Sequence, residues 1–527
     1  MDRKSHVNIC SIKMKKIVNI FLYFFLIPLV LGQNPEPKKI TSLYFPDDET
    51  IENVTPALQK KKGFTNYEEL LTFLKTQKEN HPELISIDFI GKSQKGFDIP
   101  IVYIKNNQFS NEKIKVWLQG GLHGNEMGST ESMLYLIYKL LNDKKLSYLL
   151  EKIQLAIVPM ANIDGYLKED RYAANGLDLN RDQTKLMAPE SVILKNTFSN
   201  YSPEVALDFH EYNPYRRDFA KMGSFGVSSI YDVMFLYSSN LNVAKNIRII
   251  TDSLFVGNVR KVMDQNRLRH ADYMSTDTYF GEIHFNRGSS SARSSASSYA
   301  LANSISALIE VRGVRLDRNS FKRRIKTSYL TGLTFLETTF SNFDLVKKTL
   351  KDVLYINQKL SVSSKKNIYK DTIEVIDMDN YSILKLPITV RDAKGAITTL
   401  EREKPEAYIL TKEMNFLVEK IKTLGLKVEI TTEDNTFKVE AYTVTDYDKD
   451  ETTYEKMNLQ EVKTQISIKE ILFPKGSFII NTNQKNARLL FEVLEPEMPS
   501  SFISFGVLET KKDQELAIYR LSQKNKQ

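Results

Sequence analysis

Thiols are almost absent from this chain of 527 residues, because Cys10 is its only cysteine. Cys10 lies upstream of a cleavage site that we expect near residue 32, so the processed chain contains no thiol. This absence excludes disulfide bonds and cysteine zinc ligands from the mature protein. Any bound metal ion must therefore be held by His, Asp or Glu side chains.

Long apolar runs are also scarce, and the only one spans residues 17–32. Three lysines at residues 13–16 precede it, and a polar segment follows, which is the pattern of a secretory signal peptide. The alternative is an uncleaved membrane anchor, which the short run and Pro28 disfavour. We therefore expect residues 1–32 to be a signal peptide and the mature protein to be secreted or periplasmic, without stable membrane insertion.

The chain has no large excess of charge of one sign. Residues 1–32 carry five Lys or Arg and one Asp, so their removal lowers the formal net charge from +8 to +4. Such a small excess gives no reason to expect a nucleic-acid partner. The chain is 42% hydrophobic and 26% charged, which is ordinary for a globular protein with a sizeable core.

Histidine is rare as well, and none of the six follows His284. The length favours two domains. We expect a polar leader at residues 33–63, a domain carrying the chemistry at residues 64–343, and a β-rich C-terminal domain at residues 344–527. The last segment reads mainly as strands, including a hairpin at residues 388–398 and a strand, helix, strand unit at residues 407–430.

The stretch around which the chain is organised is residues 116–126. A buried strand ends there in a turn that carries His123 and Glu126, and apolar residues at helical spacing follow over residues 133–141. Ligands bind at the carboxyl ends of strands in open α/β sheets. A His and a Glu three residues apart can bind one Zn²⁺, although such a pair alone is a weak signal and is often merely solvated.

Two further polar groups lie at the ends of predicted strands. His210 ends the strand at residues 205–211, and Glu310 ends the strand at residues 305–310. Each residue could instead have a purely structural role. Glu310, for example, could simply pair with Arg312. Because His123 and Glu126 also lie at the end of a predicted strand, we hypothesise that these four residues form one site.

In order along the chain, His123-x-x-Glu126, Asn180-Arg181, Asp208-Phe209-His210 and Ile309-Glu310 resemble the zinc carboxypeptidase family of the carboxypeptidase A type. The similarity runs from about Phe64 to about Phe340 and suggests a bacterial-type member with a C-terminal extension. It implies an α/β fold with a mixed twisted sheet and helices on both faces. The C-terminal domain would then be a smaller, β-rich α+β unit.

The resemblance also implies a role for each site residue. One Zn²⁺ per chain would be held by His123, Glu126 and His210, with Glu310 as general base and acid. Arg171 would stabilise the oxyanion, Asn180 and Arg181 would bind the substrate's terminal carboxylate, and Asp178 would orient a ligating histidine. A lid tyrosine is expected before the strand of Glu310, with Tyr273, Tyr279 and Tyr299 as candidates.

The function that follows is a zinc metallocarboxypeptidase acting on peptides or proteins with a free C-terminus. A zinc amidase or deacylase acting on N-acyl amino acids or cell-wall peptides is the alternative within this fold, and an inactive zinc-binding or peptide-binding module is the alternative without catalysis. The presence of Asn180 and Arg181 argues against the former, and the presence of Glu310 against the latter. The sequence does not indicate an oligomeric state.

Two segments remain open. The Ser-rich residues 288–298 read either as a flexible linker or, as we prefer, as a small-residue loop or helix inside the domain. The basic residues between Arg315 and Lys326 read as a solvated helix face or, less favourably, as an anion site.

Overall fold

The computed structural model describes residues 36–109, 112–355 and 359–522. The signal peptide expected at residues 1–32 lies outside the described residues. Within the described part of the chain, none of the helices has the length and apolar character needed to span a membrane.

The central element is a mixed sheet of eight strands in the order β1-β2-β4-β3-β5-β11-β7-β8. Its middle strands β4, β3, β5 and β11 are parallel. β1 pairs antiparallel with β2, and β2 with β4, whereas β7 pairs antiparallel with β11 and parallel with the edge strand β8. The strands span β1 Ile85–Lys92, β2 Asp98–Ile104, β3 Ile114–Gly120, β4 Ile153–Val158, β5 Val205–Tyr212, β7 Val233–Leu236, β8 His270–Asp272 and β11 Ile305–Arg312.

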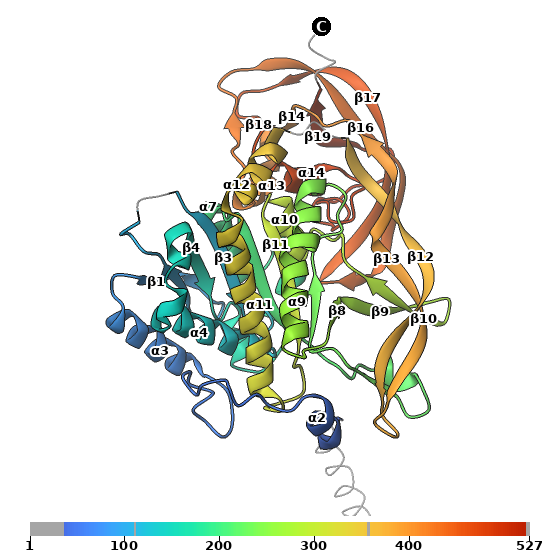
Figure 1. Cartoon of the computed structure of the whole chain (residues 1–527). Coiled ribbons are helices and arrows are strands. Elements are labelled where there is room, and N and C mark those ends of the chain that lie inside the picture. Colours follow the sequence, from blue (N-terminus) through green and yellow to red (C-terminus); the bar gives the residue numbers. More distant parts are fainter. Residues whose placement is uncertain (1–35, 110–111, 356–358, 523–527) are drawn as a thin grey trace, which may run out of the picture.

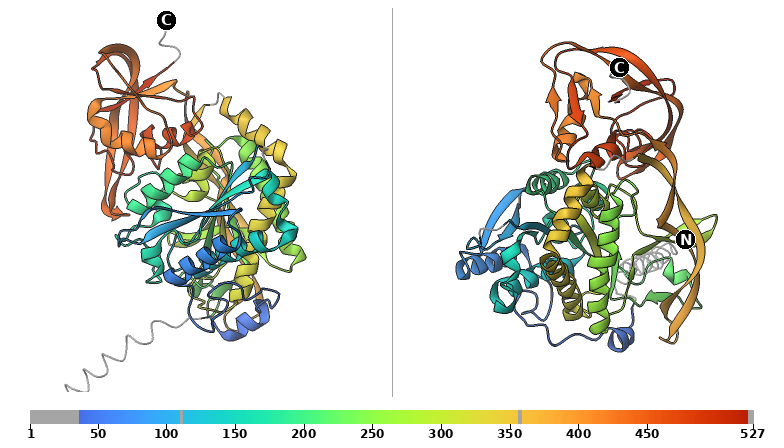
Figure 2. Two further views of the ribbon diagram at one scale, coloured as in Figure 1. Left: turned by 90° about the vertical axis from the view of Figure 1, so that its left-hand side faces the viewer. Right: turned by 45° about the horizontal axis from the view of Figure 1, so that its top comes forward.

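Helices cover both faces of this sheet (Figure 2). On one face α4 and α9 pack against α11, and on the other lie α7 and α10. The helices span α3 Tyr67–Asn80, α4 Met127–Asn142, α5 Leu149–Lys152, α6 Ile163–Tyr166, α7 Pro189–Tyr201, α8 Lys245–Ile250, α9 Gly257–Gln265, α10 Ser295–Leu301, α11 Phe321–Ser341 and α12 Phe343–Asp352. The predicted fold class is therefore confirmed.

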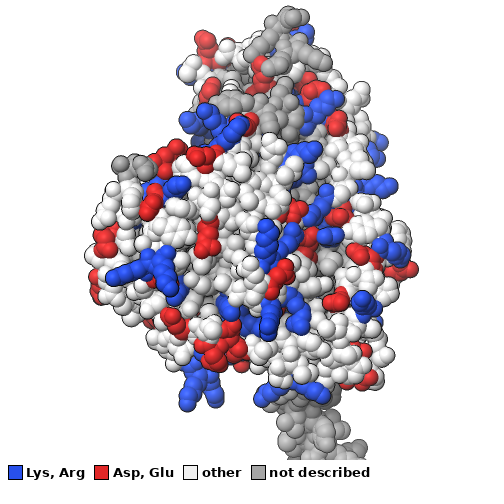
Figure 3. Space-filling model, in the orientation of Figure 1, with Lys and Arg blue, Asp and Glu red and all other residues white. Residues whose placement is uncertain are grey.

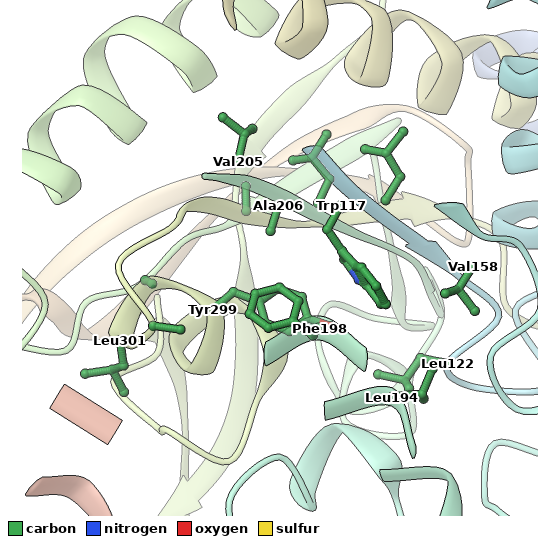
Figure 4. Close-up of a cluster of buried hydrophobic side chains, with 14 of the residues drawn as sticks. Trp117, Leu122, Val158, Leu194, Phe198, Val205, Ala206, Tyr299 and Leu301 are labelled. Carbon is green, nitrogen blue, oxygen red and sulfur yellow. The ribbon is translucent and has the colours of Figure 1, made fainter. Parts of the chain in front are cut away.

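The core beneath α7 and α10 explains why the central strands are mostly apolar. Trp117 of β3 meets the ring of Phe198 of α7 edge-on at 5.6 Å, and Phe198 stacks on Tyr299 of α10 at 4.2 Å (Figure 4). All three side chains are buried. A parallel strand covered on both faces has no solvent side, so it reads as a continuous hydrophobic run.

A second sheet of five strands has the order β6-β12-β13-β10-β9. It joins strands from both sides of the domain boundary expected near residue 343, and that boundary stays a prediction. Its long strands β12 and β13 run along one side of the molecule (Figure 1). The strands span β6 Val227–Ser229, β9 Met274–Tyr279, β10 Glu282–Arg287, β12 Leu360–Asp377 and β13 Ile383–Arg402.

The hairpin predicted at residues 388–398 is wrong, because β13 runs without a turn through Lys394-Gly395. The partner strand β12 continues alongside, with Asn367 paired to Asp392 and Lys365 to Ile397, and the extra residues form irregularities in the ladder. Turn-forming residues were therefore accommodated as a local distortion of a long strand rather than as a reversal.

A third sheet of six strands, β15-β18-β14-β19-β16-β17, forms the upper part of the molecule in Figure 1 together with α13 and α14. Its β14, α13 and β15 are the strand, helix, strand unit expected at residues 407–430. The elements span β14 Ala407–Leu410, α13 Asn415–Thr423, β15 Glu429–Ile430, β16 Asn435–Tyr454, β17 Met457–Phe473, β18 Phe478–Asn481, α14 Ala487–Leu494 and β19 Glu515–Leu521.

The described part of the expected leader begins with α2 (Lys38–Tyr44), whose Ile40 lies in a buried cluster with Ile230 and Ile376. The residues after α2 contact the helices of the central sheet. The backbone N–H of Ala57 donates to the buried carboxylate of Glu131 in α4 at 2.9 Å. Lys326 of α11 pairs with Asp48 at 2.7 Å. None of the described leader residues 36–63 lines the cleft described below.

The basic cluster at residues 315–326 is only partly a solvated face: Arg315 is exposed, but other members form ion pairs within the fold. Arg324 is buried and binds Glu211 through two hydrogen bonds of 2.7 and 2.8 Å, and Arg323 pairs with the buried Asp232 at 2.7 Å. These side chains form ion pairs with residues that are distant in sequence. A run of charges along the sequence cannot reveal such pairs. On the face shown in Figure 3, basic and acidic side chains are interspersed rather than gathered by sign.

Candidate active site

The turn after β3 carries the first two site residues. His123 and Glu126 are both buried, and Glu126 immediately precedes the first residue of α4. Gly124 between them touches the backbone of the short helix α6, since a Cβ there would lie 2.0 Å from the carbonyl carbon of Gly165. Only glycine allows this close approach, which fixes the turn against α6.

The side chains of His123, Glu126 and His210 converge at one point. Nδ1 of His123 lies 2.7 Å from one oxygen of Glu126, and Nδ1 of His210 lies 2.9 Å from the other. The two Nδ1 atoms are 3.0 Å apart. All three residues are buried, and their donor atoms lie within 4.8 Å of one another.

A carboxylate lies behind each histidine. Nε2 of His123 lies 3.0 Å from Oδ1 of Asp178, and Nε2 of His210 lies 2.9 Å from Oδ2 of Asp208. Asp178 accepts the Nε2 proton of His123, and Asp208 lies at ion-pair distance from Nε2 of His210. Carboxylates on the Nε2 side leave each Nδ1 lone pair directed at the point of convergence. This arrangement is the one that histidine metal ligands use.

The local electrostatics favour a positive charge at this point. Burial alone would lower the pKa of His210, but Asp208 and Glu126 raise it well above its ordinary value. Burial would raise the pKa of Glu126, but His123 and His210 lower it below its usual range. Two nitrogen donors and one carboxylate oxygen are a suitable set for Zn²⁺, so the residues fit the metal that the resemblance implies.

Glu310 lies beside this group without joining it. It occupies the position on β11 that pairs with His210 on the neighbouring parallel strand β5. Burial and the nearby carboxylate of Glu126 raise the pKa of Glu310 to about 7. Arg312, which could have been its partner, binds Glu36 instead. The carboxylate of Glu310 therefore faces the cleft rather than a structural cation.

The three other residues implied by the resemblance, Arg171, Asn180 and Arg181, line the same cleft, which has a volume of about 810 Å³. Arg171 donates to Oδ2 of Asp178 from Nε and Nη2 at 3.1 and 2.8 Å. Oδ1 of Asn180 accepts the backbone N–H of Ser295 at 2.8 Å. Asn180 thereby joins the short helix η3 (Leu179–Arg181) to the start of α10, and its amide nitrogen remains a potential donor.

The three candidate tyrosines occupy different environments. Tyr299 is buried against Phe198 in the core, so it cannot be a lid. Tyr273 and Tyr279 both line the cleft. Burial and the charge of Glu310 raise the pKa of Tyr273, whereas Tyr279 packs against the guanidinium of Arg391 at 4.0 Å. Tyr273 is therefore the candidate nearest the chemistry.

The structure shows the contacts of several other residues near the site that the sequence did not predict. Asp208 belongs to the motif Asp208-Phe209-His210, but the sequence assigned it no role. Its spacing of two residues from His210, which places both side chains on one face of a strand, could have indicated their contact. Glu211 accepts the backbone N–H of Gly128 at 2.9 Å while it binds Arg324, so it anchors the first turn of α4. The Ser-rich segment contains α10 and lies inside the fold, as preferred.

Comparisons with known proteins agree with this geometry. Residues 70–214 match the family model described as zinc carboxypeptidase. Carboxypeptidase 2 of Trichophyton rubrum is 30% identical over 441 residues, which cover 82% of this chain and 81% of that protein. Probable carboxypeptidase 2 of Arthroderma benhamiae is 30% identical over 419 residues, covering 77% of this chain and 78% of that protein.

Among solved structures, carboxypeptidase A from Helicoverpa armigera aligns with a TM-score of 0.41 and 18% identity over 54% of this chain and 78% of that chain. The two matched relatives above are fungal, so they do not single out a bacterial subgroup. Their identity extends over most of the length of each protein compared. This chain belongs to the zinc carboxypeptidase family.

Proposed function

We propose that this protein is an exported zinc metallocarboxypeptidase that hydrolyses the C-terminal peptide bond of peptides or proteins. The observation that supports the proposal most strongly is the convergence of two imidazole nitrogens and one carboxylate within 4.8 Å, beside a second carboxylate, Glu310, that forms no ion pair with the other described residues. His123, Glu126 and His210 would hold one zinc ion per chain. When bound, zinc supplies a Lewis acid that polarises a carbonyl group and acidifies water.

Glu310 acts as general base and then general acid. Its raised pKa, about 7, suits a group that must take a proton from water and return it to the leaving amine near neutral pH. Within the part of the chain that the structure describes, no cation lies at ion-pair distance from Glu310, which leaves its carboxylate available for both transfers.

Arg171 stabilises the negative charge that develops on the carbonyl oxygen. Its guanidinium is held by Asp178, with Nη1 3.7 Å from Glu126, so it points toward the proposed metal site while part of the side chain faces the cleft. A fixed donor of this kind stabilises a charge that exists only in the transition state. Asp178 itself orients His123.

Asn180 and Arg181 bind the terminal carboxylate of the substrate. The amide nitrogen of Asn180 and the guanidinium of Arg181 form a pair of donors on one short helix, suited to a two-oxygen acceptor. Recognition of a free carboxylate at this end of the cleft restricts cleavage to the last peptide bond.

The organisation of the chain completes the proposal. Residues 1–32 serve as a signal peptide, 33–63 as a leader, 64–343 as the catalytic domain and 344–527 as the C-terminal domain. The substrate is a peptide or protein, and the site calls for no nucleic acid.

The test is hydrolysis of a peptide panel with free and amidated C-termini, with and without a chelator. We expect only free-ended peptides to be cleaved, with activity lost on chelation and restored by Zn²⁺. Equal cleavage of amidated peptides would support the amidase or deacylase alternative. Zinc binding without any hydrolysis would support an inactive binding module.

A further inference from the structure

Arg293 is a guanidinium in the cleft that the proposed mechanism does not use. It lies in the loop before α10 and lines the cleft together with Arg181. Its Nε donates to the hydroxyl of Ser291 at 3.1 Å, and its backbone carbonyl accepts the N–H of Gln183 at 3.2 Å. Among the described residues, no carboxylate lies within ion-pairing distance of Arg293.

Two aromatic rings from the C-terminal part of the chain fix this guanidinium. Its central carbon lies 5.3 Å from the ring of Tyr454, at the end of β16, and 4.6 Å from the ring of Phe505. Planar guanidinium groups stack favourably on aromatic rings, which limits their conformations without consuming their hydrogen-bond donors. Arg293 is therefore held in place by these rings and by the Nε contact with Ser291, while its Nη donors remain available to a ligand.

Charge in this part of the cleft is unbalanced. Burial and the neighbouring Arg181 lower the pKa of Arg293, so the two cations repel each other. The charge of one acid, Glu455, acts on Arg293 in the opposite direction, and the carboxylate of Glu455 accepts the backbone N–H of Asp178 at 2.9 Å. Arg171 differs from both, because Asp178 binds it directly. Arg181 and Arg293 thus form a pair of cations that an anionic ligand would relieve.

One terminal carboxylate does not require two guanidinium groups in addition to Asn180. We infer that Arg293 binds a second carboxylate, the side chain of a C-terminal Glu or Asp, and so makes this protein selective for acidic terminal residues. The inference rests on the proposed function and names its substrate class. The aromatic contacts further assign the C-terminal region a part in specificity, since it supplies both rings that hold Arg293.

The test compares peptides that differ only in a last residue of Glu or Gln, which have nearly the same shape. The wild-type zinc-loaded protein should cleave the Glu peptide with a kcat/KM about 10- to 100-fold higher, the range expected for hydrogen bonds to a charged group. Arg293→Gln should abolish this preference by lowering kcat/KM for the Glu peptide alone. Arg248→Gln is the matched control, because Arg248 is also partly buried but lies outside the cleft.

Other outcomes would overturn the inference. An equal or better rate with the Gln peptide would do so, as would a loss in Arg293→Gln that is the same for both peptides, since Arg293 would then bind the terminal carboxylate. If no free-ended peptide is cleaved, the proposed function fails, and calorimetry still decides the specificity. L-Glutamate should then bind more tightly than L-glutamine to the zinc-loaded wild type, and equally weakly to Arg293→Gln.

Discussion

Asp178 binds Nε2 of His123 through one of its carboxylate oxygens, at 3.0 Å. Its other oxygen binds Arg171 at 2.8 Å. Burial opposes ionisation of Asp178, but His123 and Arg171 lower its pKa well below the ordinary value, so it is a carboxylate throughout the working pH range. One side chain therefore couples the orientation of a proposed metal ligand to that of the proposed oxyanion-stabilising arginine.

The first prediction concerns this coupling. Asp178→Asn should weaken zinc binding about 10- to 100-fold, because a neutral amide orients His123 less strongly and no longer increases its basicity. Competition with a chromogenic chelator measures the affinity. Asn175→Asp, in the neighbouring loop, is a control for altered charge and should leave zinc affinity nearly unchanged. An Asp178→Asn protein with wild-type affinity would contradict the role given to this residue.

The second prediction separates metal binding from catalysis. Glu310→Gln should lower kcat by about 10²- to 10⁴-fold, since general acid and base catalysis contributes that much, while one zinc still binds per chain. Steady-state kinetics and metal analysis of the same sample provide the measurement. His210→Ala is the contrasting variant and should lose zinc and activity together. Loss of zinc from Glu310→Gln would show that Glu310 is a ligand instead.

The third prediction tests the anchor of α4. Arg324→Leu leaves the buried carboxylate of Glu211 without its cation, which should lower the free energy of unfolding by about 3–5 kcal/mol. Lys322→Ala is the control, because its partner Glu49 is 82% exposed and such surface pairs contribute about 0–1 kcal/mol. Urea unfolding of the three proteins gives both values. Equal small losses would mean that Glu211 finds another partner.

The fourth prediction is a pH dependence of stability at the contact between α14 and the catalytic region. Burial raises the pKa of Glu492 to about 7, and its Oε1 accepts hydrogen bonds from the side-chain amides of Asn240 and Asn242 at 2.8 and 2.9 Å. Between its ordinary value of 4.5 and about pH 7, the folded state binds a proton that the unfolded state releases. The contribution of Glu492 is thus full below pH 4.5 and is lost as the pH rises to 7.

Glu492→Gln removes this dependence. The variant should match the wild type near pH 4.5 and exceed its unfolding free energy by at most about 3 kcal/mol at pH 8. Thermal unfolding of both proteins across this range provides the comparison. Glu419→Gln, a substitution at a side chain that is 60% exposed, should show no such divergence. A constant difference between wild type and Glu492→Gln would refute the prediction.

Much of the central sheet could be predicted because the sequence patterns that indicate its strands lie within short stretches of the chain. The strand expected at residues 205–211 differs from β5 by one residue, since the apolar run at its start marks it as a buried strand. The meeting of His210 and Glu310 also follows from the sequence, because both end apolar strands and parallel strands bring their carboxyl ends to one edge. The hairpin at residues 388–398 failed because a local turn signal cannot reveal a long partner strand.

The sequence by itself determined which chemical groups the protein could use: with Cys10 as its only cysteine, a site with several metal ligands must draw them mainly from His, Asp and Glu. Their order along the chain also indicated the family. Only the tertiary structure decided that Asp208 lies behind His210, that Arg324 is buried against Glu211, and that Tyr454 and Phe505 hold Arg293. The physical reason is that these contacts join residues far apart in the chain or depend on side-chain direction, which is set when separate elements pack together.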